Sequence, residues 1–296
     1  MGVVFAHSHV QRKPRAMKID KILVPVDFSA CSRNALQYAI DLAEKTDAKL
    51  HLLHSHYQPV PTIDIPVAID VYPKQDEQML IDSWLELTEE VPRLRKIDYT
   101  RDTQPGFLTD VVLKTLEQQS FDLIIMGTKG CSNRLDKLLG SNAYNIARES
   151  PIPVMVIPEA RNFNGFGHIA MAADFHALDD PATLRLIRSL AESFKSEVHL
   201  LHVSSTPRNL SIEEAQEALN LNEYFKDTAH HFEFITESDV VGGIERYVNE
   251  HNIDLTVLIP RHHTVFEKLF KQQVTRNTIL NANMPMMVLH DDEPEV

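Results

Sequence analysis

Runs of consecutive apolar residues alternate along the chain with longer segments in which apolar residues recur every three or four positions. Runs such as residues 21–27 (KILVPVD), 50–54 (LHLLH) and 122–126 (DLIIM) are typical of strands covered on both faces. Helical spacing is shown by four early residues: Leu36, Ala39, Ile40 and Ala43. Residues 72–94 are predicted to form a second helix, which carries Met79, Leu80, Trp84 and Leu87. Alternating strands and helices predict a parallel sheet with right-handed crossovers and helices on both faces.

The same pattern occurs a second time later in the chain. Residues 168–174 (HIAMAAD) and 198–202 (VHLLH) repeat the first two strands. A helical face lies between them, with four apolar residues three or four positions apart: Leu184, Ile187, Ala191 and Phe194. The last apolar run of the first copy, 154–157, corresponds to 286–289. Matching order at several separated places predicts two copies of one α/β unit.

The repeats set the expected domain boundaries. The segment 158–167 (PEARNFNGFG) carries Pro, Asn and Gly with few apolar residues, which favours a connection between repeats. We therefore expect a first domain at 17–158, a linker at 159–167 and a second domain at 168–292. Residues 1–16 place a basic patch after a short apolar run, the reverse of a secretory signal, so we expect a disordered extension or a tag.

Composition narrows the class of protein. With 43% hydrophobic and 24% charged residues, each repeat can bury a core of its own. A net charge of −13 argues against general binding to nucleic acids or anionic membranes. No apolar stretch approaches the roughly 18 residues that a membrane span needs. The two cysteines, Cys31 and Cys131, are too few for a disulfide framework, so we expect a reducing, cytoplasmic location.

A glycine motif in the first repeat is the strongest chemical signal. Residues 127–130 read Gly-Thr-Lys-Gly, and after nine further residues positions 140–142 read Gly-Ser-Asn. The first glycine follows a predicted strand, and Ser141 begins a helical pattern. Such a loop can hold phosphate, because glycines permit positive φ and close approach while the helix N–H groups point at the anion. Asp27 ends the first strand and is expected on the same rim of the sheet.

Together these residues resemble a known family. A strand ending in Val-Pro-Val-Asp-Phe-Ser, then G-x-x-G, nine residues and G-S, resembles the universal stress protein family in its ATP-binding branch. The resemblance covers nearly all of residues 17–292, counted as two copies. It implies an α/β fold of two flavodoxin-like (adenine nucleotide alpha hydrolase-like) repeats, each with a five-stranded, mainly parallel sheet. It also implies that the last strands, 154–157 and 286–289, pair with each other as an intramolecular pseudo-dimer.

The resemblance implies a nucleotide site in the first repeat. By position, Asp27 and Ser55 would face the adenosine, although the family usually has an aliphatic residue where Ser55 stands. The ribose and phosphates would be lined by seven residues: Met126, Gly127, Lys129, Gly130, Gly140, Ser141 and Asn142. The implied ligand is ATP, with Mg²⁺ held by the phosphates.

The second repeat departs from this motif. In place of Gly127, Gly130, Gly140 and Ser141 it has Ile259, His262, Gln272 and Gln273, although Asp174 is kept. Because positive φ is costly for a branched residue, the second loop cannot cheaply follow the same path. We therefore expect no ATP in this mode in the second repeat.

Several residues also have simpler explanations. Asp27 could serve as a cap for the helix that follows it. Cys31 and Cys131 could be sensor thiols, but ordinary thiols are the more economical interpretation. Lys129 could neutralise phosphate or only solvate the loop.

Fifteen histidines raise the question of a metal site. No metal-type spacing such as His-Glu-x-x-His occurs, so we expect no specific metal site. His51 and His199 match across the repeats, which favours a packing role.

The expected function is ATP binding by a stress-response sensor or regulator whose state an unknown protein partner recognises. No catalytic base or nucleophile–His pair accompanies the loop, so at most slow hydrolysis is expected. One alternative is a ligand-independent interaction scaffold, with the second repeat as the partner surface. Another is an adenine nucleotide α-hydrolase enzyme, but residues 27–32 (DFSACS) lack the glycines that its loop after strand one requires. Further pairing of two chains into a homodimer stays open.

Overall fold

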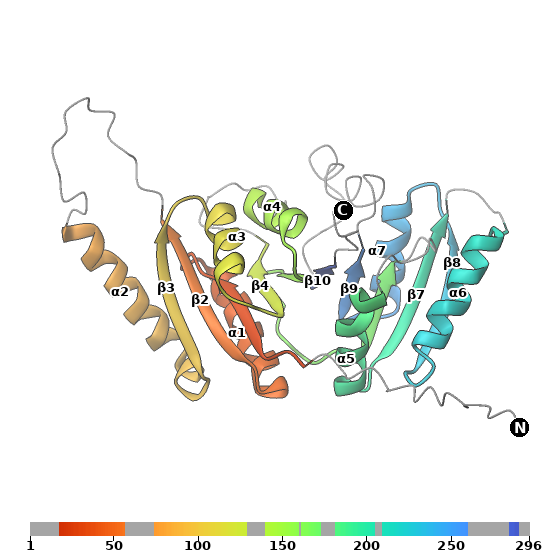
Figure 1. Ribbon diagram of the computed structural model, residues 1–296, viewed down its shortest axis with the longest axis horizontal. Helices are drawn as coiled ribbons and strands as arrows, with labels where there is room; N and C mark the ends of the chain where they lie inside the picture. The colour runs from red at the N-terminus through yellow and green to blue at the C-terminus, as the bar shows by residue number, and fades with distance from the viewer. Residues whose placement is uncertain are drawn as a thin grey trace, which may run out of the picture.

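The structure, a computed structural model, describes residues 18–56, 74–128, 140–159, 161–172, 181–204, 209–259 and 284–289. Within these residues the strands form one ten-stranded sheet with the order β3-β2-β1-β4-β5-β10-β9-β6-β7-β8. Figure 1 shows the two halves of this sheet side by side, with helices packed around each half. The predicted two-repeat α/β fold is therefore confirmed.

Each repeat contributes five strands to the sheet. The first repeat has β1 (Lys21–Pro25), β2 (Lys49–His56), β3 (Tyr99–Pro105), β4 (Leu123–Gly127) and β5 (Val154–Ile157). The second has β6 (His168–Ala172), β7 (Glu197–Ser204), β8 (His230–Thr236), β9 (Leu255–Leu258) and β10 (Met286–Val288).

The helices follow the same order in both repeats. Those of the first repeat are α1 (Ala30–Thr46), α2 (Lys74–Glu90), α3 (Leu108–Gln118) and α4 (Ser141–Glu149), with the 3₁₀ helix η1 (Pro92–Lys96). The described helices of the second repeat are α5 (Arg185–Phe194), α6 (Ile212–Tyr224) and α7 (Val240–Glu250), with the 3₁₀ helix η2 (Pro181–Leu184). Among the described residues, no helix combines the length and apolar character needed to cross a bilayer.

The two repeats meet through their last strands. All pairings within a repeat are parallel, whereas β5 and β10 pair antiparallel, with Met155 opposite Met287. This is the pairing that the family resemblance implied. It removes one exposed sheet edge from each repeat and so protects both from unwanted strand addition.

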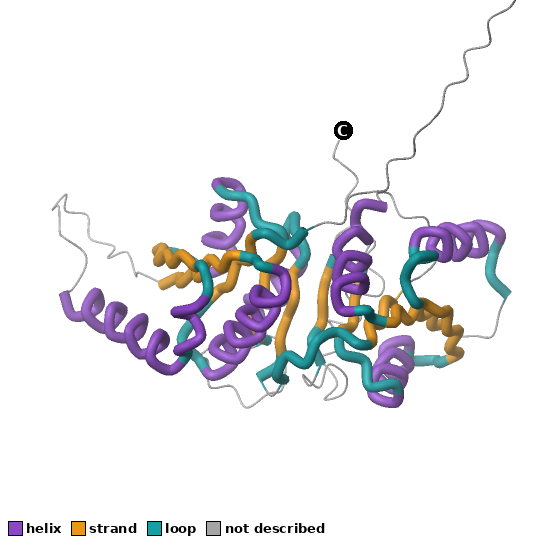
Figure 2. Tube along the Cα trace, turned by 90° about the horizontal axis from the view of Figure 1, so that it is seen from below, coloured by secondary structure: helices purple, strands orange, loops and turns teal. Residues whose placement is uncertain are grey.

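Helices cover both faces of the sheet (Figure 2). Successive strand residues point to opposite faces, so Ile22 and Val24 join one buried cluster while Leu23 joins another. The first cluster runs under α1, α2, α5 and α6 and is shared by both repeats. Two separate clusters lie on the opposite face, one under α3 and α4 and one under α7. One continuous core therefore joins the two repeats.

The segment that was predicted to be a linker takes part in this core. Phe166 is only 1% exposed, and its ring lies edge-on to the rings of Phe194 (5.0 Å between centroids) and Phe163 (5.2 Å). The Asn34 side chain of α1 donates hydrogen bonds to the carbonyl oxygens of Pro158 and Arg161. The segment is therefore packed against both α1 and α5, which its few apolar residues did not predict.

The second predicted helix is shorter than expected. Residues 72 and 73 lie outside the described residues, and α2 ends at Glu90, short of residue 94. Pro92 follows, and it cannot donate the next helical hydrogen bond, so the chain changes to the 3₁₀ helix η1. Trp84 and Leu87 are buried as expected, but Met79 is 67% exposed.

Candidate functional site

The predicted site lies where the strands of the first repeat end. Because β1, β2 and β4 are parallel, their carboxyl ends meet at one rim of the sheet, and α4 begins there (Figure 1). The end of β1 is tied to that of β2 by two bonds: Val26 N donates to Leu53 O (2.8 Å), and His54 Nδ1 lies 2.7 Å from Val26 O.

Asp27 is held at this rim by the turn that leads into α1. Its Oδ1 accepts hydrogen bonds from the backbone N (3.1 Å) and the hydroxyl (2.6 Å) of Ser29. Ser29 is itself the N-cap of α1, since its Oγ accepts from Ser32 N at 3.2 Å. The alternative that Asp27 caps α1 is therefore wrong. The N-cap is Ser29, and Asp27 holds Ser29 in place through two hydrogen bonds.

The turn itself is strained. Phe28, between Asp27 and Ser29, has φ of 60°, a left-handed conformation that costs a non-glycine residue about 1–2 kcal/mol. Its ring packs against His54 (4.7 Å between centroids) and edge-on to Trp84 (5.1 Å). These contacts fix the direction in which the Asp27 carboxylate leaves the strand.

Gly127 has a structural reason to be glycine. A Cβ atom there would lie 2.8 Å from Cys31 Sγ and 3.0 Å from the backbone of Cys31, so any side chain would collide with α1. Among the described glycines only Gly106 and Gly165 have positive φ. Gly127 and Gly140 therefore do not use the positive φ that glycine permits. Gly140 is extended, with φ of −64°, and Gly130 lies outside the described residues.

The start of α4 is fastened to the end of β4. Gly140 N donates to Thr128 O at 2.6 Å, and Thr128 N donates to Ile157 O at 3.1 Å. Gly140 is the N-cap and has no side chain to satisfy the first N–H groups of the helix. Ser141 and Asn142 are exposed, and the first turn of α4 contains no acidic residue. An exposed, uncapped helix N-terminus of this kind favours an anion.

The remaining predicted site residues are placed as follows. Met126 is buried within the core on the α3–α4 side, so only its backbone can face a ligand. Ser55 is half-buried near the end of β2, where it pairs with Gln104 of β3. Lys129 and Gly130 lie outside the described residues. These contacts place Asp27, the α1 N-terminus, Gly127 and Gly140 along one rim.

Only one of the two cysteines lies among the described residues. Cys31 is 3% exposed, and its Sγ lies 3.5 Å from Thr128 Oγ1. This buried position matches an ordinary packing thiol better than a sensor. Cys131 lies outside the described residues.

In the second repeat, only part of the corresponding rim is described. Ile259 follows β9 and packs partly buried against the shared core, at the place where the first repeat has Gly127. Asp174, His262, Gln272 and Gln273 lie outside the described residues. The absence of ATP binding there stays a prediction.

Comparison with known sequences decides the family. The sequence profile of the universal stress protein family matches residues 18–158 and 165–290. The chain belongs to this family. The two matched segments correspond to the two structural repeats, so it is a tandem universal stress protein.

Single-repeat relatives match about half of this universal stress protein. Universal stress protein YxiE of Bacillus subtilis is 24% identical over 148 residues, which are 47% of this chain and 98% of the relative. Universal stress protein A homolog 1 of Coxiella burnetii is 26% identical over 145 residues, 48% of this chain and 97% of the relative.

Two solved structures extend over almost the whole tandem chain. A universal stress protein from Archaeoglobus fulgidus superposes with a TM-score of 0.68 at 17% identity, covering 93% of this chain and 98% of that one. A protein described as a putative universal stress protein from Pseudomonas aeruginosa gives 0.61 at 20% identity, covering 93% and 94%. At these identities the likeness shows the fold.

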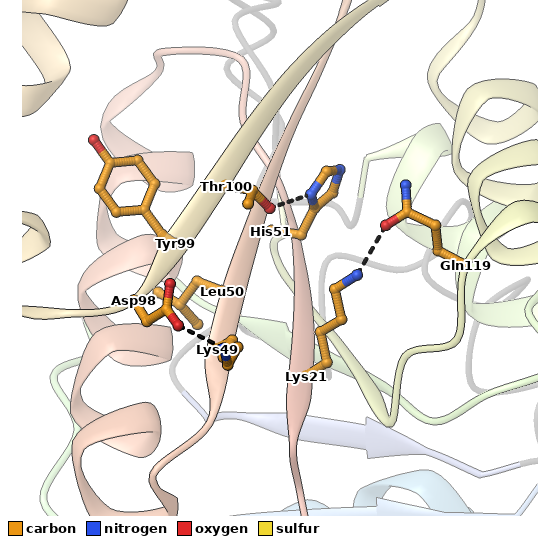
Figure 3. Close-up of a pocket in the computed structure, with 8 residues that line it drawn as sticks. All are labelled: Lys21, Lys49, Leu50, His51, Asp98, Tyr99, Thr100 and Gln119. Atoms are coloured by element: carbon orange, nitrogen blue, oxygen red, sulfur yellow. Dashed lines mark hydrogen bonds and ion pairs between the residues drawn. The ribbon is translucent and has the colours of Figure 1, made fainter.

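A surface hollow of about 370 Å³ lies at the opposite end of the first repeat, beside the amino ends of β1 and β2 (Figure 3). Its lysines already have partners: Lys49 Nζ lies 2.7 Å from Asp98 Oδ2, and Lys21 Nζ donates to Gln119 Oε1 at 2.8 Å. This hollow is separate from the glycine motif, and both of its lysines have hydrogen-bonding partners within it.

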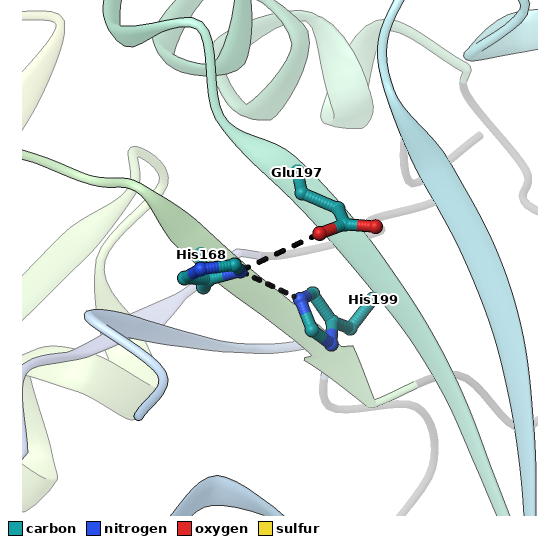
Figure 4. A group of neighbouring side chains, drawn as sticks. All are labelled: His168, Glu197 and His199. Carbon is teal, nitrogen blue, oxygen red and sulfur yellow. Dashed lines mark hydrogen bonds and ion pairs between the residues drawn. The ribbon is translucent and has the colours of Figure 1, made fainter. Parts of the chain in front are cut away.

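The equivalent end of the second repeat carries a group that the sequence analysis missed. His168, Glu197 and His199 place one nitrogen or oxygen atom each within 4.8 Å of one another (Figure 4). Burial, and then the neighbouring His231, lower the pKa of His199 to about 4, so its ring is neutral at pH 7. These residues do not form a local motif, since His168 and His199 are 31 positions apart and are brought together by strand pairing.

Proposed function

We propose that this universal stress protein binds ATP, or a related adenine nucleotide, with Mg²⁺ at the rim of its first repeat. Its function would be that of a nucleotide-dependent sensor or regulator in the stress response. The observation that carries the proposal is the exposed N-terminus of α4, tied by the bond from Gly140 N to Thr128 O beside the strand that ends at Gly127.

Different residues would bind the phosphates, the ribose and the adenosine. The first N–H groups of α4, with Ser141 and Asn142, would receive the phosphates, because the helix N-terminus carries partial positive charge. Asp27, oriented by Ser29, would accept a hydrogen bond from a ribose hydroxyl, and Ser55 would face the adenosine. Lys129, Gly130 and the backbone of Met126 complete the expected set. Mg²⁺ would be held by the phosphates.

We expect this site to hydrolyse ATP slowly at most. The described residues at this rim include no nucleophile–His pair, and the one histidine in contact with β1 there, His54, bonds to Val26 O. Burial, the largest factor, lowers the pKa of His54 below its usual value and so favours the neutral ring over the cation. The nucleotide would therefore act as a bound signal, with slow hydrolysis at most.

Calorimetric titration of nucleotide-free protein with ATP and Mg²⁺ tests the proposal, and one equivalent per chain is expected. Asn142→Asp should weaken binding about tenfold, because a new carboxylate in the first turn repels phosphate. The same change at Asn145, one turn later in α4, is the matched control and should have a smaller effect.

Two results would count against the proposal. Equal ATP affinity for Asn142→Asp and the wild type would show that the phosphates do not bind at the N-terminus of α4. No binding to protein shown to be free of nucleotide would favour the ligand-independent interaction scaffold, and pull-down with the full chain would then be the next step.

A further inference from the structure

We propose that the second repeat binds one divalent first-row transition metal ion, of the Zn²⁺ type, through His168, Glu197 and His199. The three side chains converge at the amino ends of β6 and β7 (Figure 4), whereas the proposed nucleotide site lies at the carboxyl ends of the first repeat's strands. Two imidazoles and one carboxylate form a ligand set that suits Zn²⁺ and its neighbours in the first transition row.

Strand register brings the ligands together. His168 begins β6 and is paired directly with Glu197, which begins β7. His199 lies two residues further along β7, so its side chain leaves the same face of the sheet as that of Glu197. The three positions are therefore fixed by backbone pairing in the interior of the sheet and do not depend on a loop.

The separations match those of metal ligands. His168 Nδ1 lies 3.1 Å from His199 Nε2 and 3.7 Å from Glu197 Oε2. Two ligand atoms bound to tetrahedral Zn²⁺ at the usual bond lengths lie about 3.4 Å apart, between these two values. His199 is 3% exposed, whereas the His168 and Glu197 side chains are each 44% exposed. The ion thus has a route from solvent and room for water as a fourth ligand.

A second layer of hydrogen bonds orients the ligands. His199 Nδ1 lies 2.9 Å from the Tyr247 hydroxyl, which lies 3.2 Å from His231 Nε2. His231 Nδ1 in turn lies 3.1 Å from Glu197 Oε1. One assignment of protons satisfies all three contacts: His199 Nδ1–H donates to Tyr247, the Tyr247 hydroxyl donates to His231, and His231 Nδ1–H donates to Glu197.

This assignment leaves the metal-facing atoms as acceptors. With its proton on Nδ1, His199 presents an unprotonated Nε2, and Glu197 presents Oε2 as a free carboxylate oxygen. At 3.1 Å, His168 Nδ1 and His199 Nε2 need either a proton or a cation between them, because two lone pairs repel. A metal ion would replace that proton.

The first repeat lacks this chemistry at the same positions. Its counterparts in strand register are Lys21 for His168, Lys49 for Glu197 and His51 for His199. Two of the three counterparts are thus lysines, which cannot bind a metal ion as ammonium groups. The third, His51, has its Nδ1 2.7 Å from Thr100 Oγ1 (Figure 3). The ligand set is a property of the second repeat, and the fold evidently accepts lysines at two of its positions.

Binding of Zn²⁺ to chelator-stripped full-length protein, measured against a competing chromophoric chelator, tests the proposal. We expect one equivalent that depends on Glu197: Glu197→Gln should lower affinity at least tenfold, while Glu223→Gln, the same change at an exposed site on α6, should not. Tyr247→Phe should lower affinity about 10- to 100-fold, as expected for loss of a partner that orients a ligand. His51→Ala should leave the affinity unchanged.

The double variant His168→Lys with Glu197→Lys introduces the residues of the first repeat and should abolish the site. Co²⁺ bound to the wild type should give the visible absorption of a tetrahedral site, and this variant should not. Circular dichroism of each variant without metal checks the fold. If the wild type takes up no Zn²⁺, or if Glu197→Gln and Glu223→Gln bind it equally, the cluster is only a structural hydrogen-bond network and the proposal is wrong.

Discussion

The packing of Phe166 gives the sharpest test of how the two repeats are joined. Phe166→Ala removes a ring that is 1% exposed and lies between α1 and α5 in the shared core. Replacing a fully buried Phe by Ala costs about 3–5 kcal/mol. The edge-to-face contacts with Phe163 and Phe194 argue against the lower end of that range, so we expect a loss of about 4 kcal/mol.

Equilibrium unfolding in urea, followed by circular dichroism, measures this loss. For a chain of this size the dependence of the unfolding free energy on urea is about 3 kcal/mol per molar, so the midpoint should fall by about 1.3 M. Phe107→Ala is the control, because Phe107 is 66% exposed and its side chain makes no capping bond; its effect should stay within about 0.5 kcal/mol.

Coupling between the aromatic residues can be measured directly. A double-mutant cycle of Phe166→Ala and Phe194→Ala should give an interaction of about 0.5–1.5 kcal/mol, since their ring centroids are 5.0 Å apart. A loss below about 1 kcal/mol for Phe166→Ala would refute the reasoning, because a ring outside the core costs little to remove. The segment would then be a simple tether.

Two further predictions concern single side chains. Gly127→Ala should destabilise the fold by about 1–3 kcal/mol, because its Cβ would lie 2.8 Å from Cys31 Sγ; thermal unfolding with and without Cys31→Ala checks whether relieving part of the contact restores stability. Burial, and then Asp239, raise the pKa of Glu245 from 4.5 to about 8. A raised folded pKa means that this group's contribution to stability is full below pH 4.5 and is lost as pH rises through about 8. Glu245→Gln should therefore gain stability over the wild type across that range, by about 1 kcal/mol after solvent screening; equal pH profiles of unfolding for the two proteins would contradict it.

The strands of the sheet interior could be predicted from the chain alone, but its two edges could not. Consecutive apolar residues identify β1, β2 and β4, because both faces of these strands are buried. The edge strands β3 (YTRDTQP) and β8 (HHFEFIT) mix polar with apolar residues and are partly exposed. They lack the consecutive apolar runs of the interior strands, and they pair with β2 and β7 at the edges of the sheet.

Part of the candidate nucleotide site could also be predicted from the sequence, and part could not. The start of α4 at Ser141 and the position of Asp27 on the rim follow from the pattern of strands, glycines and helices. That Asp27 bonds to Ser29, and that Gly127 makes room for Cys31, could not be predicted, since these contacts depend on how α1 packs against the sheet.

The family resemblance, the two repeats and the order of their main elements could be inferred from the amino-acid sequence alone. These follow from local periodicity and from motifs whose residues are close together in the chain, and the pairing of the last strands was implied by the family resemblance. The packing of Phe166 in the core and the meeting of His168 with Glu197 and His199 became visible only in the folded chain. Such contacts depend on strand register and helix packing between distant segments, and a shift of one residue in register would turn the side chains to the other face.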